Sequence, residues 1–296
     1  MKNKKLSAAS RREENWGWIM VAPTIIGLFI LNIWPFIQTI YTSCCEHLGF
    51  GHYKFIGIQN YIDMFSDPDF WKATWNTVWF CFLTVPVGVI LALFVAMLLK
   101  SKIKFKGGCR TIFFLPLVCA PAAVAMVWQW IFNGQYGILN QLLGTDIQWI
   151  TNSKTAVLAV AIVSVWSSVG YDAVLLLAGL QNIPKTLYEA NSIDGAGKIR
   201  QFFTITLPMV SPTMFSVLIM RLMSSMKVYD LIYMMSDDTN PAMANMQSLM
   251  YLFDRSSFVA GDRGYGSAIV VWTVFVILLV TLIQFWGQKK WVTYDI

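Results

Sequence analysis

Charged residues are scarce in this sequence, and their scarcity excludes an ordinary soluble protein. Asp, Glu, Lys and Arg make up 13% of the 296 residues, whereas hydrophobic residues make up 56% and the mean hydropathy is +0.56. A typical soluble domain carries roughly twice that share of charge. It could not bury this much apolar surface, so we expect a membrane protein.

Residues that usually carry catalysis or bind metals are also few. The two histidines, His47 and His52, lack the spacing of metal ligands, and the five cysteines are odd in number and scattered, which argues against a disulfide framework. Residues 195–198 resemble part of a phosphate loop, but Ser192 and Ile199 stand where that motif needs Gly and Ser or Thr. The sequence therefore predicts no enzyme: no catalytic residue, no metal site, and no cofactor or ATPase site of its own.

Apolar runs, by contrast, are long and numerous. Six stretches are long enough to cross a hydrocarbon core, which takes about 20 residues in helical form. They are 17–41, 76–99, 111–132, 155–180, 209–235 and 265–287. Helices are expected because lipid leaves no unpaired backbone group and the alternation of a membrane barrel is absent. We predict an all-α polytopic membrane protein with six transmembrane helices: a tail 1–16, a membrane domain 17–290 and a C-terminus 291–296.

Positive charge is distributed unevenly over the predicted loops. If the N-terminus lies inside, 15 of the 22 Lys and Arg residues lie on the inner side, five lie outside and two lie within the fifth span. Cytoplasmic loops of membrane proteins are rich in Lys and Arg. We therefore interpret the net charge of +6 as a topology signal rather than a sign of nucleic-acid binding. It predicts a multi-pass protein of the cytoplasmic membrane with both termini in the cytoplasm.

One polar segment, 184–208, lies between the fourth and fifth predicted spans. Pro184 suits a helix start, and residues 185–194 have near-helical apolar spacing. Asp194-Gly195 predicts a stop, because Gly adopts the left-handed conformation that ends helices. A second short helix is expected over 196–204, with Pro208 allowing a sharp entry into the next span. The segment is either a helix–turn–helix that a partner binds or an amphipathic linker lying on the lipid surface.

The spacing of residues in this segment carries a family resemblance. Glu189-Ala190, Asp194-Gly195-Ala196, Ile205 and Leu207-Pro208 fall as in the pattern EAA-x-x-DGA…I-x-LP. The segment thus resembles the cytoplasmic coupling loop of ABC importer permeases; Asn191 departs from the second Ala of the triplet. Other stretches are similar to carbohydrate-importer permeases, in particular to the first permease of the maltose and glycerol-3-phosphate systems. They include FLP at 114–116, WQWIFN at 128–133 and AGLQNIP at 178–184.

The resemblance implies a type I ABC importer permease fold and a set of partners. These are a second permease subunit forming a heterodimer, two ATPase subunits that hold ATP and Mg, and an extracytoplasmic substrate-binding protein. The cargo would be a sugar of di- or oligosaccharide size, and the location the bacterial inner membrane. The residues expected to couple the chain to the ATPase are Glu189, Ala190, Asp194, Gly195, Ala196, Phe203, Leu207 and Pro208.

Four charged residues lie inside the predicted spans, where unpaired charge is costly. Lys227 and Asp230 are three residues apart and can neutralise each other. Arg221 has no such neighbour and needs a partner from another helix or from a solute. Polar and aromatic residues near Asp172 suggest a translocation path, although helix packing is an alternative. The candidate path residues are Trp166, Tyr171, Asp172, Arg221 and Tyr229.

Two other functions are compatible with the sequence. Arg221 and Lys227 would suit glycerol-3-phosphate or another anionic polyol, whereas the aromatic residues favour a neutral sugar. An ion-driven secondary transporter would need paired repeats and intramembrane carboxylates. Asp172 is the only deep carboxylate in the predicted spans, which argues against that class.

Overall fold

The computed structural model describes residues 8–49, 51–101 and 106–293 of the chain. The described part is almost entirely helical, with one short antiparallel hairpin of strands β1 (Cys45–His47) and β2 (Tyr53–Phe55). Five helices are long and apolar enough to cross a membrane, and a sixth span is formed by two shorter helices. The predicted all-α class with six spans is confirmed.

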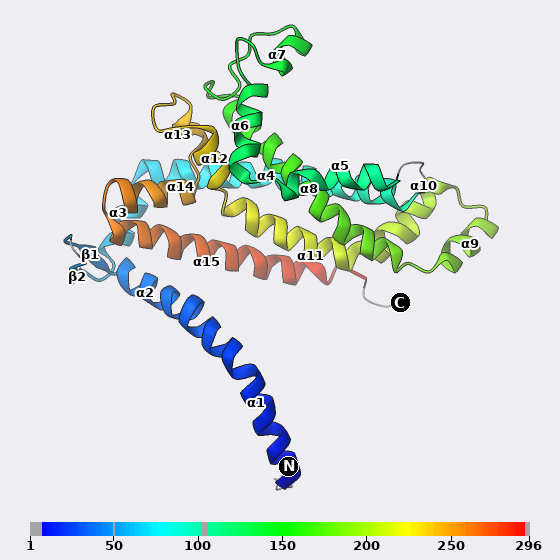
Figure 1. Ribbon diagram of the computed structural model, residues 1–296, viewed down its shortest axis with the longest axis horizontal. Coiled ribbons are helices and arrows are strands. Elements are labelled where there is room, and N and C mark those ends of the chain that lie inside the picture. The colour runs from blue at the N-terminus through cyan, green and yellow to red at the C-terminus, as the bar shows by residue number, and fades with distance from the viewer. Residues whose placement is uncertain (1–7, 50, 102–105, 294–296) are drawn as a thin grey trace.

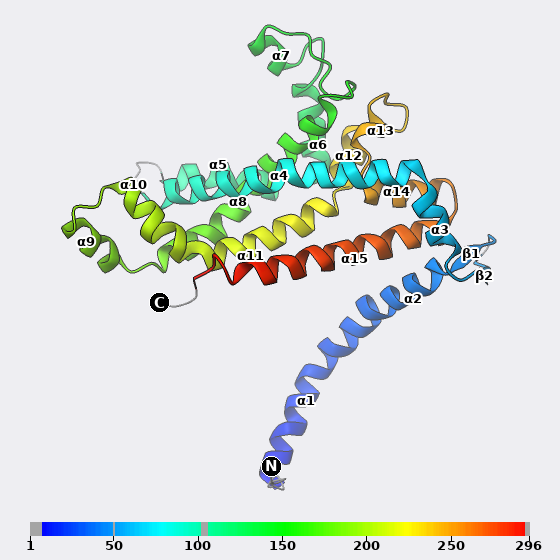
Figure 2. The ribbon, with the colours of Figure 1, turned by 180° about the vertical axis from the view of Figure 1, so that it is seen from behind.

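The first span stands apart from the rest of the molecule. Helix α1 (Ala8–Leu28) continues through a π-helical turn, Phe29–Ile33, into α2 (Trp34–Ser43). Figures 1 and 2 show α1 projecting away from the other helices, and its apolar window is wholly exposed. The tail expected over 1–16 is helical from Ala8 onwards, and residues 1–7 lie outside the described part.

The core of the bundle is the contact between α4 (Pro68–Lys100) and α8 (Ala156–Gln181). Small buried residues on both helices, such as Ala92, Ala96 and Ala173, let the backbones approach closely. Helix α11 (Leu207–Met226) packs against both, and α15 (Arg263–Gln288) lies beside α11 and α2. Helices α8 and α15 begin and end within two residues of the bounds predicted for the fourth and sixth spans.

The third span is broken, which the sequence analysis did not predict. Helix α5 (Lys106–Val118) and helix α6 (Pro121–Ile131) meet at an angle of 104°. The residue before a proline is pushed out of the helical region, and Ala120 has an extended backbone before Pro121. The continuous helix expected over 111–132 is therefore two helices that turn sharply at Cys119 and Ala120.

The fifth span is shifted towards the N-terminus relative to the prediction of 209–235. A helix starts at α10 (Lys198–Gln201) and runs through a π-helical turn, Phe202–Thr206, into α11, which ends at Met226. The separate short helix expected over 196–204 and the sharp entry at Pro208 are wrong. A proline inside a helix clashes with the carbonyl four residues earlier, and the wider π turn just before Pro208 accommodates it. Beyond Met226 the chain turns and forms α12 (Asp230–Met235).

Short elements cover the two ends of the bundle. Helix α9 (Lys185–Ile193) and α10 lie together at one end (Figure 1). The other end carries the hairpin, α3 (Gln59–Ser66), α13 (Met243–Met246), α14 (Leu249–Asp254) and a π-helical turn, Arg255–Val259. Helix α7 (Ile138–Leu143) stands out above α6. In the described part of the chain, one end thus carries the protruding loop of α9 and α10, and the other carries the hairpin and several short helices.

Gly170 is essential for the approach of α8 to α5. A Cβ atom at this position would overlap the backbone carbonyl of Phe113, which cannot move as a side chain can. We predict that Gly170→Ala lowers the free energy of unfolding by about 1–3 kcal/mol. Gly287→Ala is the matched control, because a Cβ atom there meets nothing within 4 Å. Thermal unfolding of the purified protein in detergent measures both; equal stability of the two variants would contradict the predicted overlap.

Candidate functional site

The polar loop at the end of the bundle is built around a helix stop at Gly195. Helix α9 begins after Pro184, whose extended backbone positions the first turn. Its end has the two hydrogen bonds of a Schellman motif: Gly195 N–H donates to the Ser192 carbonyl at 3.1 Å, and Ala196 N–H to the Asn191 carbonyl at 3.0 Å. Gly195 has φ +74°, a conformation that side chains disfavour. The Asp-Gly-Ala sequence thus supplies the turn that was predicted for it.

Hydrogen bonds hold the loop as one unit against the bundle. The Gln201 amide donates to Ser192 Oγ at 2.8 Å and to the Ala196 carbonyl at 3.2 Å. The hydroxyls of Tyr188 and Thr206 lie 3.0 Å apart and link α9 to the start of the fifth span. Tyr188 also packs on the α4–α8 core, so α9 contacts the ends of the spanning helices.

Apolar side chains on this loop are exposed rather than packed against the chain itself. Ile193 is 87% exposed, Ile199 78% and Phe203 60%. Exposed apolar clusters mark contact sites for a protein or a membrane. Phe203 was predicted as a contact residue from the sequence, whereas Ile193 and Ile199 were not. Their apolar side chains on either side of the Gly195 turn could have indicated them.

The predicted coupling residues divide into two groups. Glu189, Ala190 and Asp194 are exposed with Gly195 and Phe203, where a partner could touch them. The other three contribute to packing: Ala196 is 9% exposed, and Leu207 and Pro208 are half-buried at the start of α11. The structure therefore places only part of the motif on the surface of the loop.

A buried ion pair lies where α4, α8 and α11 meet. Arg221 Nε on α11 is 3.1 Å from Asp172 Oδ2 on α8, and the residues are 5% and 2% exposed. Gly88 on α4 leaves room for the guanidinium, because a Cβ atom there would lie 2.8 Å from Arg221 Nη2. The expectation that Arg221 needs a partner from another helix is met by Asp172.

The pair leaves hydrogen-bonding capacity unused. Arg221 Nε and Nη2 and Asp172 Oδ2 have no hydrogen-bond partner within the described chain, so the 3.1 Å contact lacks the alignment of a hydrogen bond. Buried charges of this kind stabilise a fold only when their remaining groups are also satisfied. Arg221 can therefore both hold α8 and contact a bound solute.

A cavity of about 340 Å³ adjoins Arg221 at the bend between α5 and α6. Its polar lining comes from α8, α11 and α12 and includes Ser164, Ser167, Ser168, Tyr171, Arg221, Ser224 and Asp230. Ser167 Oγ is buried and has no hydrogen-bond partner among the described residues. Hydroxyl groups, an aromatic ring and a guanidinium can bind a hydroxylated solute. Ser164 and Ser224 were missed because only packing of separate helices reveals that they share a cavity.

The other predicted path residues lie elsewhere. Trp166 contacts Trp128, with ring centroids 5.5 Å apart, and lines an apolar cavity instead. Tyr229 stacks on Tyr233 at 5.4 Å, beyond the end of α11, and does not line the cavity at Arg221. Throughout the described ranges Lys227 forms no ion pair with Asp230, so the predicted mutual neutralisation is wrong.

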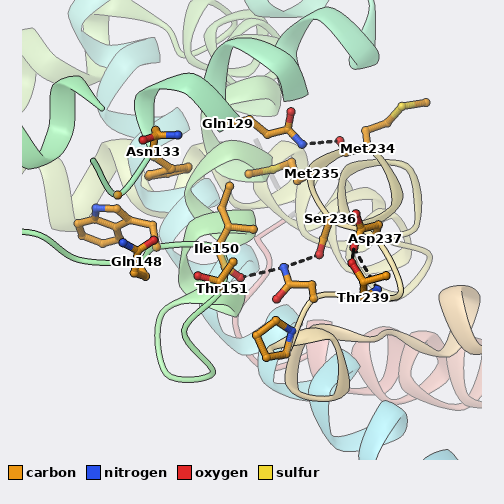
Figure 3. A pocket seen from close by; sticks show the side chains of 15 residues that line it. Gln129, Asn133, Gln148, Ile150, Thr151, Met234, Met235, Ser236, Asp237 and Thr239 are labelled. Carbon is orange, nitrogen blue, oxygen red and sulfur yellow. Dashed lines mark hydrogen bonds between the residues drawn. The ribbon is translucent and has the colours of Figure 1, made fainter. Parts of the chain in front are cut away.

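A larger cavity of about 620 Å³ opens between α6 and the segment after α12 (Figure 3). The Gln129 amide donates to the Met234 carbonyl at 3.0 Å, and the Asn240 amide donates to the Ile150 carbonyl at 3.3 Å, so hydrogen bonds join the two walls. Gln148 and Trp149 also line it. Planar amides and an aromatic ring suit carbohydrate recognition, yet the sequence analysis proposed no site here.

The segment 236–241 is tied to α14 by a buried phenol. Tyr251 Oη donates to Asp238 Oδ1 at 2.8 Å. Burial, together with this hydrogen bond, raises the pKa of Tyr251 above its ordinary value. The phenol therefore stays protonated and keeps one rim of the larger cavity in place at physiological pH.

The chain is similar to known proteins in sequence and in fold. Residues 84–292 match the family described as binding-protein-dependent transport system inner membrane component. The sulfoquinovosyl glycerol transport system permease of Agrobacterium fabrum is 35% identical over 86% of this chain and 83% of its own length. The trehalose/maltose transport system permease of Thermococcus litoralis is 32% identical over 96% and 97%. The sn-glycerol-3-phosphate permease of Salmonella choleraesuis is 31% identical over 94% and 95%.

A solved structure shares the fold. One chain of a bacterial alginate ABC transporter, crystallised with an alginate pentasaccharide-bound periplasmic protein, has a TM-score of 0.84. The match covers 96% of this chain and 98% of that chain at 20% identity. This likeness shows that the arrangement of helices is that of an ABC importer permease.

The ion pair predicts a particular pattern of stabilities. Asp172→Ala and Arg221→Ala should each lose about 3–5 kcal/mol, because each leaves a buried charge without its partner. The double variant Asp172→Leu/Arg221→Met removes both charges and should recover most of that loss. Thermal unfolding in detergent tests this. If the double variant were no more stable than the single ones, the ion pair would not be the source of the effect.

Proposed function

Because the chain belongs to the family of inner membrane components of binding-protein-dependent transport systems, we propose that it carries a sugar across the membrane through the cavity at Arg221. The chain is a permease subunit of an ABC importer. The observation that carries the proposal is the cavity itself, where serine hydroxyls, Tyr171 and Arg221 from separate helices face one space. Relatives named for sulfoquinovosyl glycerol and for trehalose and maltose support a polyhydroxylated cargo.

The charge of the site favours a neutral cargo. Asp172 lies 3.1 Å from Arg221 and balances most of its charge, so an anion would gain little net attraction. Hydroxyl groups of a sugar can accept from Arg221 Nη2 and exchange hydrogen bonds with Ser167 and Ser224. The larger cavity at Gln129 and Trp149 would receive the sugar first, from an extracytoplasmic binding protein.

A second candidate cargo is glycerol-3-phosphate or another anionic polyol. The observation that favours it is Arg221 Nη2, a buried cationic donor that lacks a hydrogen-bond partner within the described residues. A guanidinium binds phosphate well. The relative from Salmonella choleraesuis, named for sn-glycerol-3-phosphate, supports this alternative.

Energy would come from separate ATPase subunits that hold ATP and Mg. The loop around Gly195, with Glu189 and the exposed Ile193, Ile199 and Phe203, would lie in a groove on the ATPase, a helix-in-groove contact. Closure of the ATPase pair would pull α9 and, through Tyr188 and Thr206, the fifth span. ATP acts by binding one conformation better than the other.

The assembly would contain a second permease, which completes the path. It would be a heterodimer of two permeases with two ATPases and one binding protein. Both termini of this chain would lie in the cytoplasm. The exposed apolar surface of α1 and α2 fits lipid or the second permease. In this arrangement the chain holds no nucleotide and no metal itself.

The turn at Gly195 provides a test of coupling. Gly195→Val forces a β-branched residue into a left-handed conformation and should reshape the loop. Gly195→Asn is the matched control, because Asn tolerates that conformation. In the complete transporter, the Val variant should lose at least tenfold in substrate-stimulated ATP hydrolysis, whereas the Asn variant keeps most of it. Normal stimulation in the Val variant would argue against coupling through this turn.

The cavity at Arg221 provides a test of the path. Ser224→Phe would fill much of the 340 Å³ with an apolar ring and should reduce uptake into proteoliposomes at least tenfold. Leu282→Phe is the control, because Leu282 is 69% exposed on α15 and is not part of the cavity lining. Assembly of both variants is checked by co-purification with the partner subunits. Undiminished uptake by an assembled Ser224→Phe transporter would place the path elsewhere.

A further inference from the structure

A third polar cavity lies under the coupling loop and belongs neither to the path nor to the exposed loop surface. Its volume is about 730 Å³. It lies between the ends of α4 and α8 and the starts of α9 and α10. Three lysines line it: Lys100 is the last residue of α4, Lys185 the first of α9 and Lys198 the first of α10.

The charge around this cavity is uncompensated. No carboxylate lines it, and in the ranges that the structure describes none of the three lysines forms an ion pair within 4 Å. The nearest acidic residues in sequence, Glu189 and Asp194, are exposed on the loop outside the lining. Three like charges around one space repel one another and attract an anion.

One of the lysines is held in place. Lys100 Nζ donates to the Leu180 carbonyl at 2.9 Å, at the end of α8, and lies 5.0 Å from the centre of the Tyr188 ring. An ammonium group has three donors, so two remain for a ligand. Ser101 adds a hydroxyl beside it, and Tyr188 and Thr206 form the wall that joins the loop to the fifth span.

We propose that this cavity binds a phosphate-bearing anion. Lys100, Lys185 and Lys198 bind the phosphate oxygens, and Ser101 donates a further hydrogen bond. The lining also contains the apolar residues Met97, Leu180 and Ile183, so the cavity accepts the hydrocarbon part of an amphiphile as well. Basic cavities at the inner ends of spanning helices are typical sites for anionic lipid headgroups. A soluble phosphate ester offers the same charged group without the hydrocarbon.

The bound anion would act on the coupling loop. The anion would connect lysines from α4, α9 and α10 across a space whose wall is formed by Tyr188, Gln201 and Thr206. Occupancy would therefore stiffen the link between the loop and the bundle and strengthen coupling to the ATPase. This consequence rests on the proposed function, whereas the binding itself does not.

Binding can be measured without transport. The intact transporter is placed in nanodiscs of phosphatidylcholine alone or with added phosphatidylglycerol, and inorganic phosphate is titrated into the former. We expect the thermal midpoint of the wild-type complex to rise with one of the two ligands. A rise with phosphatidylglycerol alone identifies a lipid headgroup, and a rise with inorganic phosphate identifies a soluble anion; either supports the site.

The variants place the effect in the cavity. Lys185→Gln/Lys198→Gln removes two charges but keeps Lys100, which supports α8. It should weaken the apparent affinity for the effective ligand at least tenfold. Lys289→Gln/Lys290→Gln removes two charges beyond α15, outside the cavity lining, and should leave affinity unchanged. The proposal is overturned if neither ligand shifts the midpoint, or if both double variants respond as the wild type does. Such a result leaves sugar transport untouched, since that is measured by uptake.

Discussion

The requirement that buried charge be paired in lipid determines how the central helices of this protein meet. Arg221 on α11 and Asp172 on α8 are each almost fully buried and 3.1 Å apart, with Gly88 on α4 leaving room for the guanidinium. An unpaired charge at this depth is costly. Three spanning helices are therefore held in one rotational setting, and the cavity between them has a defined polar wall.

Helices α8 and α11 also connect the ion pair with the polar loop at the end of the bundle. Helix α8 leads from the ion pair to the coupling loop, and α11 returns from that loop to the ion pair. At the end of the bundle, the hydrogen bond between Tyr188 and Thr206 joins α9 to the helix that leads into α11. In the proposed function, a displacement of α9 would reach the helices that line the cavity at Arg221 through these contacts.

Prediction from the sequence succeeded where the signal was local. Hydropathy located the fourth and sixth spans within two residues, and Asp194-Gly195 predicted the helix stop that the Schellman motif provides. It failed where proline was involved: the helix breaks just before Pro121, in the middle of the third apolar run, whereas Pro208 lies inside a continuous helix. Prolines are common in spanning helices, since neighbouring groups can satisfy the freed backbone. Only the surrounding packing distinguishes a break from a tolerated proline.

The sequence by itself determined that this is a helical membrane protein with a polar loop that turns at Gly195, because hydropathy, charge bias and turn residues act over a few neighbouring positions; the importer type came from the resemblance of that loop to a known family. Only the tertiary structure decided that Arg221 pairs with Asp172 rather than with a nearer residue. It also decided that Trp166 lies outside the polar cavity and that Lys100, Lys185 and Lys198 surround one space. These groupings depend on the rotation and axial position of helices relative to one another, which contacts between distant residues set.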